Sequence, residues 1–158
     1  MNTSTEGAKA NCYASREAAS SVPTASFTGE DSVLQDASRW LAECSDNHLN
    51  CQSENLDTSW MPLRLVKTKC MVGSDYSFRC VDTSIDRLPP QRYLTLSYRW
   101  GRPKGLQLAT STLHVLSSWT NAEVLPRTLR EALVVCAYLK ISYIWIDRLC
   151  VIQDDPQD

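Results

Sequence analysis

Hydrophobic and polar positions change their pattern several times along the chain, and each pattern predicts a different element. Val33, Trp40 and Cys44 recur at helical spacing between charged residues, which predicts an amphipathic helix over residues 31–46. Residues 1–30 are rich in Ser, Thr, Ala and Gly and contain few large apolar side chains. They are predicted to form a disordered leader, because they cannot bury enough apolar surface to fold.

Two short runs with β-character follow the predicted helix. The runs "MPLRLVKTKC" and "YSFRCVD" flank the turn signal "GSD" at residues 73–75, which predicts a β-hairpin. Pro89 and Pro90 favour an extended connection after the hairpin. The sequence therefore predicts a lead-in of a helix and a hairpin over residues 31–90, followed by a second unit over residues 91–158.

The second unit contains two apolar runs separated by a helical pattern. Residues 93–98 are predicted to form one strand, and residues 143–147 a second strand buried on both faces, because "YIWI" shows no polar alternation. Thr128 and Glu131 fit a capping box at the start of a helix over residues 128–139. The apolar stripe of this helix is Leu129, Leu133 and Cys136. Strand, helix and strand predict a βαβ unit with parallel strands, hence an α/β fold with a partial parallel sheet.

Polar and aromatic side chains follow both predicted strands, at the edge where ligands bind in open parallel sheets. We call this set the rim: Ser97, Tyr98, Arg99, Trp100 and Gly101 after the first strand, and Asp147, Arg148, Cys150, Gln153 and Asp154 after the second. A carboxylate at the end of a buried strand needs hydrogen-bond donors. We therefore expect Asp147 within reach of Ser97, Tyr98 or Arg99. The alternative is that the rim only completes the core, with Asp147 paired to Arg99 or Arg148.

Charge and composition narrow the class of partner. The formal net charge is −2 and no run is rich in Lys or Arg, so binding to nucleic acid is not expected. No apolar stretch approaches the length of a membrane span, and the N-terminus lacks the apolar core of a secretory signal. The seven cysteines, an odd number, are therefore expected to be thiols in a reducing compartment.

Three stretches together resemble a known family. "YLTLSYRWG", "LPRTLREA" and "YIWIDRLCVIQDDPQD", in this order, resemble the heterokaryon-incompatibility (HET) domain of fungal non-self recognition proteins. The upstream "WLAECSDNHLNC" is similar to the lead-in that often precedes this domain. Arg148 stands where the family usually has a small residue, and Lys140 where it usually has Gly. The family motifs fall on Tyr93, Leu96, Ser97, Tyr98, Trp100, Gly101, Leu125, Pro126, Thr128, Ala132, Trp145, Asp147, Leu149, Cys150, Gln153 and Asp154.

The resemblance implies a cytoplasmic signalling module whose activation leads to growth arrest or cell death, with other proteins of the incompatibility pathway as partners. It also implies a three-layer fold similar to Toll/interleukin-receptor (TIR) domains and flavodoxin. Some TIR domains hydrolyse NAD with a glutamate, which by analogy would lie after Asp158. We therefore expect this chain to be the front portion of the domain, without enzyme activity or cofactor, and NAD to be a possible substrate of the complete domain. The second strand would then keep an open edge, and the isolated chain would be poorly stable.

Other classes of site remain open. As an NAD-consuming enzyme, the chain would offer Arg99 and Arg148 to phosphate and Tyr98 or Trp100 to a stacked ring. The sequence has no G-x-G-x-x-G or G-K-[ST] loop, which disfavours an ordinary nucleotide site. A hydrolase is less favoured, because no G-x-S-x-G elbow is present and Cys150 has no histidine near it in sequence.

A zinc module is the last alternative. Cys44, His48 and Cys51 stand at i, i+4 and i+7, which places all three on one face if the helix continues, and Cys70 or Cys80 would be the fourth ligand. No paired C-x-x-C knuckles occur, and burial alone explains a cysteine at an apolar helix position. The sequence therefore favours no bound metal.

Overall fold

The computed structural model describes most of the chain after the predicted leader. It describes residues 31–51, 60–70, 75–101 and 105–158. The predicted leader and most of the predicted hairpin turn lie outside the described residues. The elements in chain order are α1 (Asp31–Asn47), the 3₁₀ helix η2 (Leu49–Cys51), β1 (Arg64–Cys70), β2 (Tyr76–Asp82), β3 (Leu94–Leu96), α2 (Leu113–Leu116), β4 (Thr120–Asn121), the 3₁₀ helix η4 (Ala122–Val124), α3 (Arg127–Tyr138), β5 (Tyr143–Ile146) and α4 (Asp147–Cys150).

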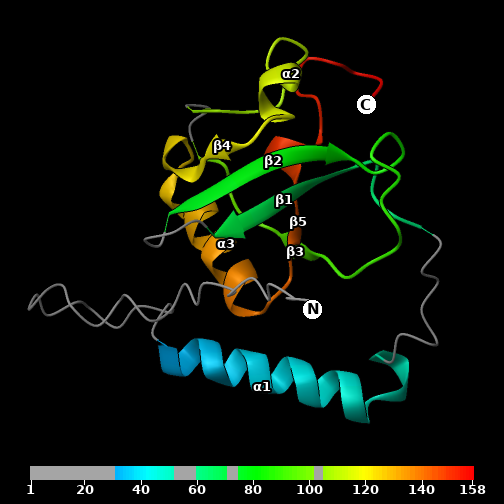
Figure 1. The fold of residues 1–158 in the computed structure, drawn as a ribbon, viewed down its shortest axis with the longest axis vertical. Helices are drawn as coiled ribbons and strands as arrows, with labels where there is room; N and C mark the ends of the chain where they lie inside the picture. The colour runs from blue at the N-terminus through cyan, green and yellow to red at the C-terminus, as the bar shows by residue number, and fades with distance from the viewer. Residues whose placement is uncertain (1–30, 52–59, 71–74, 102–104) are drawn as a thin grey trace, which may run out of the picture.

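A five-stranded sheet with the order β3-β5-β1-β2-β4 forms the centre of the fold (Figure 1). β3 and β5 are neighbours and run parallel, with Leu94 opposite Ile144 and Leu96 opposite Ile146. The predicted βαβ unit and the α/β class are therefore confirmed. The other three pairings are antiparallel, so the sheet is mostly antiparallel and not the partial parallel sheet that we predicted.

The predicted hairpin is confirmed, and its position explains this difference. β1 and β2 pair along their whole length, and β1 also pairs with β5, with Val66 opposite Ile144. Leu65 and Val66 point to opposite faces and are both fully buried, so β1 is an interior strand of the sheet. The expectation of an open edge on β5 is wrong, because β1 occupies that edge.

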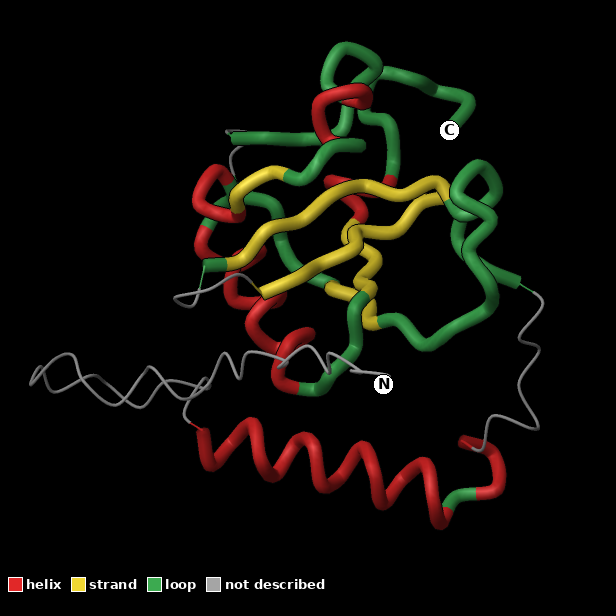
Figure 2. The backbone as a smooth tube through the Cα atoms, in the orientation of Figure 1, coloured by secondary structure: helices red, strands yellow, loops and turns green. Residues whose placement is uncertain are grey.

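Each face of the sheet carries its own hydrophobic cluster. Helix α3 lies against one face, behind the sheet in Figures 1 and 2, and its predicted stripe is fully buried there. The main cluster joins that stripe to residues from β1, β2 and β5: Val66, Phe78, Cys80, Ile144 and Ile146. The second face carries a smaller cluster of Leu65, Val81 and Tyr143, against which residues of loops and β5 pack: Met61, Leu88, Tyr93 and Trp145. The prediction that β5 is buried on both faces is thus confirmed.

Both ends of α3 differ from a simple capping pattern. The helix begins at Arg127 after Pro126, and no side chain caps its first turn, so the predicted capping box is wrong. Glu131 instead accepts a hydrogen bond from the Nε of Arg127 at 2.6 Å. At the other end, Lys140 is left-handed with φ +57°, and the Ile141 amide donates to the carbonyl of Cys136, which is a Schellman ending.

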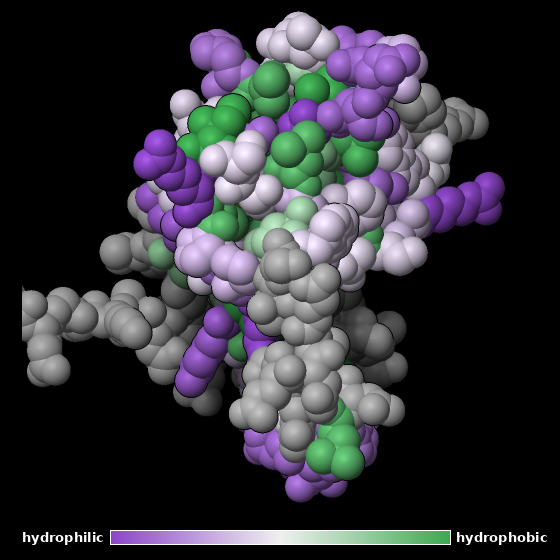
Figure 3. Space-filling model, turned by 90° about the vertical axis from the view of Figure 1, so that its right-hand side faces the viewer, coloured by the Kyte–Doolittle hydropathy of each residue, from purple (hydrophilic) through white to green (hydrophobic). Residues whose placement is uncertain are grey.

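Helix α1 matches the predicted amphipathic helix and lies beside α3 (Figure 1). Leu34 is buried, whereas Val33, Trp40 and Leu41 are 42%, 61% and 40% exposed. Hydrophobic side chains also lie at the surface elsewhere, between hydrophilic ones, on the face that Figure 3 shows. Within the described parts of the chain, no helix combines the length and the apolar character that crossing a membrane requires.

The cysteines differ in their state and burial. Those that are free thiols are Cys44, Cys51, Cys80, Cys136 and Cys150. Cys70 is disulfide-bonded, so the expectation of thiols is confirmed for five cysteines and wrong for this one. Burial raises the pKa of Cys80, Cys136 and Cys150 to about 12, so these three are neutral apolar residues at physiological pH.

Candidate functional site

The rim forms where β3 and β5 end, because parallel neighbours place their carboxyl ends at the same edge. Asp147 is the first residue of α4. Its Oδ2 accepts a hydrogen bond from the indole Nε1 of Trp100 at 2.7 Å, and its Oδ1 accepts one from the Arg148 amide at 2.6 Å. Asp147 therefore lies at the end of the first strand, as expected, but its hydrogen-bond partner there is Trp100 and not Ser97, Tyr98 or Arg99.

Arg148 lies inside the protein and not on its surface. Its side chain is 2% exposed, and it is among the largest fully buried side chains. Its Nε donates to the carbonyl of Leu106 at 2.9 Å, one terminal nitrogen donates to the carbonyl of Gly105 at 3.0 Å, and the guanidinium lies 5.3 Å from the centroid of the Trp100 ring. A buried charge is tolerated when it is hydrogen-bonded and compensated. Arg148 therefore fastens the loop at residues 105–106 to α4.

Tyr98 lies close to this pair of opposite charges. Its hydroxyl is buried and has no hydrogen-bond partner among the residues that the structure describes. Burial raises the pKa of Tyr98, and the negative charge of Asp147 raises it further, while the nearby Arg148 acts in the opposite direction. The phenol is therefore neutral at physiological pH and not prepared to act as a general base.

Gln153 and Cys150 hold the turn that ends α4. The Nε2 of Gln153 donates to the carbonyls of Asp147 at 3.1 Å and Val151 at 2.9 Å. The Sγ of Cys150 accepts from the Ile146 amide at 3.4 Å, and this thiol is 4% exposed. Because the thiolate is the reactive form, a buried thiol with a raised pKa is a poor nucleophile.

The chain before α2 is tied to the same turn. The Leu108 amide donates to the carbonyl of Arg148, and the Gln153 amide donates to the carbonyl of Leu108, both at 2.9 Å. Asp154 accepts from the amide and hydroxyl of Thr110 at 2.8 and 3.2 Å. We call the residues joined by these contacts the α4 network: Trp100, Gly105, Leu106, Leu108, Thr110, Asp147, Arg148, Gln153 and Asp154.

The rest of the rim lies at the surface. Ser97, Arg99 and Gly101 are exposed. Gly101 adopts φ +68°, which explains a glycine at the point where the chain leaves the rim. The structure thus divides the predicted rim into a hydrogen-bonded part, in which Arg148 and Cys150 are buried, and an exposed part that follows β3.

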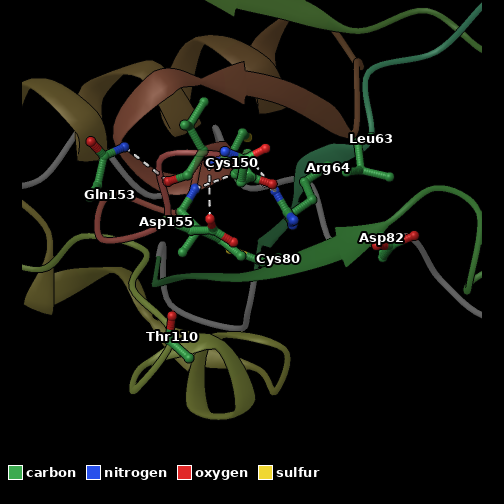
Figure 4. Close-up of polar contacts among 12 residues, drawn as sticks. Leu63, Arg64, Cys80, Asp82, Thr110, Cys150, Gln153 and Asp155 are labelled. Atoms are coloured by element: carbon green, nitrogen blue, oxygen red, sulfur yellow. Dashed lines mark hydrogen bonds and ion pairs between the residues drawn. The ribbon is translucent and has the colours of Figure 1, made fainter.

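A buried ion pair beside the α4 network was not predicted from the sequence. Arg64 on β1 donates to Asp158, 2.6 Å away. It also donates to the carbonyl of Cys150 at 3.2 Å (Figure 4). Both side chains are mostly buried. Burial by itself would raise the pKa of Asp158, but the Ile152 amide and Arg64 together lower it. An isolated arginine in a strand pattern gives no sequence signal of such a contact.

A cleft of about 420 Å³ lies beside this ion pair. Its lining is mostly apolar and aromatic and includes Trp60, Pro62, Leu63, Tyr93, Trp145 and Val151. Cys150 also borders the cleft, but its buried thiol has a raised pKa. The cleft therefore offers apolar contact area and no activated nucleophile.

Side chains of the types that bind metal ions lie elsewhere, at the C-terminal end of α1. The donor atoms of Cys44, His48 and Cys51 all lie within 4.8 Å of one another. Cys70 is disulfide-bonded, and Cys80 is buried in the sheet with its thiol donating to the carbonyl of Leu149. These two cysteines are therefore not the fourth ligand that the sequence suggested.

Residues 93–158 match the model of the family described as heterokaryon incompatibility protein (HET). The matched part contains β3, α3, β5 and the complete α4 network, whereas Arg64 and the hairpin precede it. No curated protein and no solved structure matches the chain. The resemblance seen in the sequence is confirmed over residues 93–158.

Proposed function

Because residues 93–158 match the heterokaryon incompatibility family, we propose that this chain is a signalling and interaction module of fungal non-self recognition whose activation leads to growth arrest or cell death. It acts in the cytoplasm, and its partners are other proteins of the incompatibility pathway, as the family implies. Residues 31–90 serve as the lead-in, and residues 91–158 as the HET-domain unit.

One observation carries this proposal, namely that the polar side chains of the family motif are bonded to the chain itself. Trp100, Asp147, Arg148 and Gln153 all contribute hydrogen bonds to the α4 network. Side chains used in this way fix the shape of a surface and do not present a reactive group. This arrangement supports a module that acts by binding.

The exposed apolar residues around the cleft offer a surface for such binding. Trp60 and Leu63 line it and are 67% and 52% exposed. Exposed apolar side chains that gather around a cleft are typical of protein contact sites. We therefore assign the contact surface for a partner protein to the cleft.

An NAD-consuming enzyme with a TIR-like, three-layer fold is the second candidate, for the complete domain. The parallel pair of β3 and β5, with α3 against the sheet, supports a topology of this kind. Arg148 is buried and bonded to two carbonyls, so of the two arginines considered for phosphate only Arg99 lies at the surface. This placement favours the interaction module.

Inducible expression of the chain in a filamentous fungus tests the proposal. Leu63→Ser removes an apolar side chain from the cleft, and Val115→Ser is the matched control, because Val115 is 50% exposed on α2. We expect the wild-type chain and the Val115 variant to arrest growth, and the Leu63 variant to do so less at equal abundance. No growth arrest by the wild-type chain, or equal arrest by both variants, would contradict the proposal. Nicotinamide release from NAD by the purified chain would favour the enzyme instead.

A further inference from the structure

The turn after α1 gathers three donor side chains. The His48 amide donates to the carbonyl of Cys44 at 3.2 Å, and the Cys51 amide to the carbonyl of His48 at 2.9 Å. These bonds continue a helical path through η2, so residues at i, i+4 and i+7 share one side of it. All three donor atoms lie within 4.8 Å of one another, and the Nδ1 of His48 is 3.4 Å from the Sγ of Cys44.

This spacing fits a tetrahedral zinc site. Zn–S bonds of about 2.3 Å and Zn–N bonds of about 2.0–2.1 Å, at tetrahedral angles, separate sulfur from nitrogen by about 3.6 Å and two sulfurs by about 3.8 Å. The observed 3.4 Å between the Cys44 sulfur and the His48 nitrogen is close to the first value. Small side-chain rotations would therefore bring the three donors onto one ion.

Burial does not explain these residues. The helix face that carries Cys44 also carries Val33 and Trp40, which are 42% and 61% exposed, and Cys44 itself is only half-buried. His48 and Cys51 are exposed. An ion from solvent can therefore reach all three donors, and no core packing at this position requires a cysteine.

We propose that Cys44, His48 and Cys51 bind one Zn²⁺ ion. Two thiolates and an imidazole form a soft donor set that suits zinc and disfavours magnesium or calcium. Water or a donor from another molecule completes the coordination, since zinc is four-coordinate in such sites. The bound ion fastens η2 to the end of α1. This site lies apart from the α4 network and is independent of the proposed function.

Metal analysis of the purified 158-residue chain tests the site. The chain is kept free of oxygen and of reductant, so that the disulfide of Cys70 stays intact. It is loaded with zinc, dialysed and analysed for zinc, and the apoprotein is titrated with Co²⁺. We expect one zinc ion per chain, and a cobalt spectrum with thiolate charge-transfer bands and the visible bands of a tetrahedral site. Cys44→Ser, His48→Ala and Cys51→Ser should each weaken binding about 100-fold, because each removes one of three protein ligands.

His114→Ala is the matched control, since His114 is the other histidine of the chain and is exposed on α2. It should bind zinc as the wild-type chain does. The three ligand positions lie outside the hydrophobic clusters, so their variants should keep the melting temperature of the metal-free chain. A chain that retains no zinc, or variants that bind it with wild-type affinity, would overturn the proposal. A cobalt spectrum without thiolate bands would do the same.

Discussion

Replacement of Arg148 by methionine tests the α4 network most severely, because methionine keeps an apolar stem of similar length and removes the charge. The guanidinium is 2% exposed and donates to the carbonyls of Gly105 and Leu106. Its loss leaves the carbonyls of exposed Gly105 and partly buried Leu106 without these donors. The perturbation therefore acts at the point where α4, the loop at residues 105–106 and Trp100 meet.

The expected magnitude follows from these contacts. An unpaired carbonyl costs about 1–3 kcal/mol when it is buried, and less at exposed Gly105, where water replaces the lost donor. The stacking of Arg148 on Trp100 contributes about 1–2 kcal/mol when it is shielded from water. The variant no longer desolvates a guanidinium, which offsets several kcal/mol of this loss. We expect a net decrease of about 1–2 kcal/mol in the free energy of unfolding, because only one of the two carbonyls is shielded from water.

Urea denaturation followed by circular dichroism measures this decrease. The urea concentration at the midpoint of unfolding should fall, whereas the slope of the unfolding free energy against urea concentration should stay unchanged, since the fold is the same. Arg99→Met is the matched control, because Arg99 is exposed on the rim. It should change stability by less than about 0.5 kcal/mol. An Arg148 variant as stable as wild type, or an Arg99 variant that is equally destabilised, would refute the reasoning.

Four further results are expected. Trp100→Phe removes the indole donor at 2.7 Å from its carboxylate partner and should lower the unfolding free energy by about 1.5–3 kcal/mol in the same urea assay. Lys140→Gly removes the strain of a left-handed non-glycine residue at φ +57° and should raise the free energy of unfolding by about 1 kcal/mol, seen as a higher melting temperature. A lower melting temperature would contradict this. With a chelator present, iodoacetamide should label exposed Cys51 in the native chain but Cys150, with its pKa of about 12, only after unfolding, as judged by peptide mass mapping. Because folding lowers the pKa of Asp158, its contribution to stability is complete above its unfolded pKa of about 4 and is lost as pH falls through the lower folded value. Asp158→Asn should therefore make the melting temperature less sensitive to acid. If the variant shows the same dependence of melting temperature on pH as the wild-type chain, the carboxyl of Asp158 does not make this contribution.

The elements of the fold could be predicted where the apolar pattern is strong. The helix at residues 31–46, the hairpin and the parallel pair of β3 and β5 all follow from side-chain periodicity and strand order. The pairing of β1 with β5 does not follow from the sequence pattern. Two neighbouring apolar residues such as Leu65 and Val66 are consistent with a strand buried on both faces, but they do not identify the strand beside it. The mostly antiparallel sheet was missed for that reason.

The site was predicted in position but not in detail. Both strand ends meet, as the parallel order requires, and Asp147 lies between them. The sequence placed Arg148 on the rim, as a candidate contact for phosphate, whereas backbone carbonyls far away in sequence hold its side chain in the interior. The predicted capping box is wrong for a local reason. The helix starts at Arg127, directly after Pro126, so the hydroxyl of Thr128 does not occupy the cap position. Contacts between distant segments decide such cases, and periodicity contains no information about them.

Hydrogen exchange of the tryptophan indoles, followed by NMR, tests most directly whether the family motif is joined in the α4 network. The chain has five tryptophans, and two of them, Trp40 and Trp60, are 61% and 67% exposed and serve as internal references. The indole N–H of Trp100 donates to Asp147 at 2.7 Å and should exchange much more slowly than either reference. Asp147→Ala should bring its exchange close to theirs. Equally fast exchange of all three indoles in the wild-type chain would show that the contact between the two strand ends does not exist.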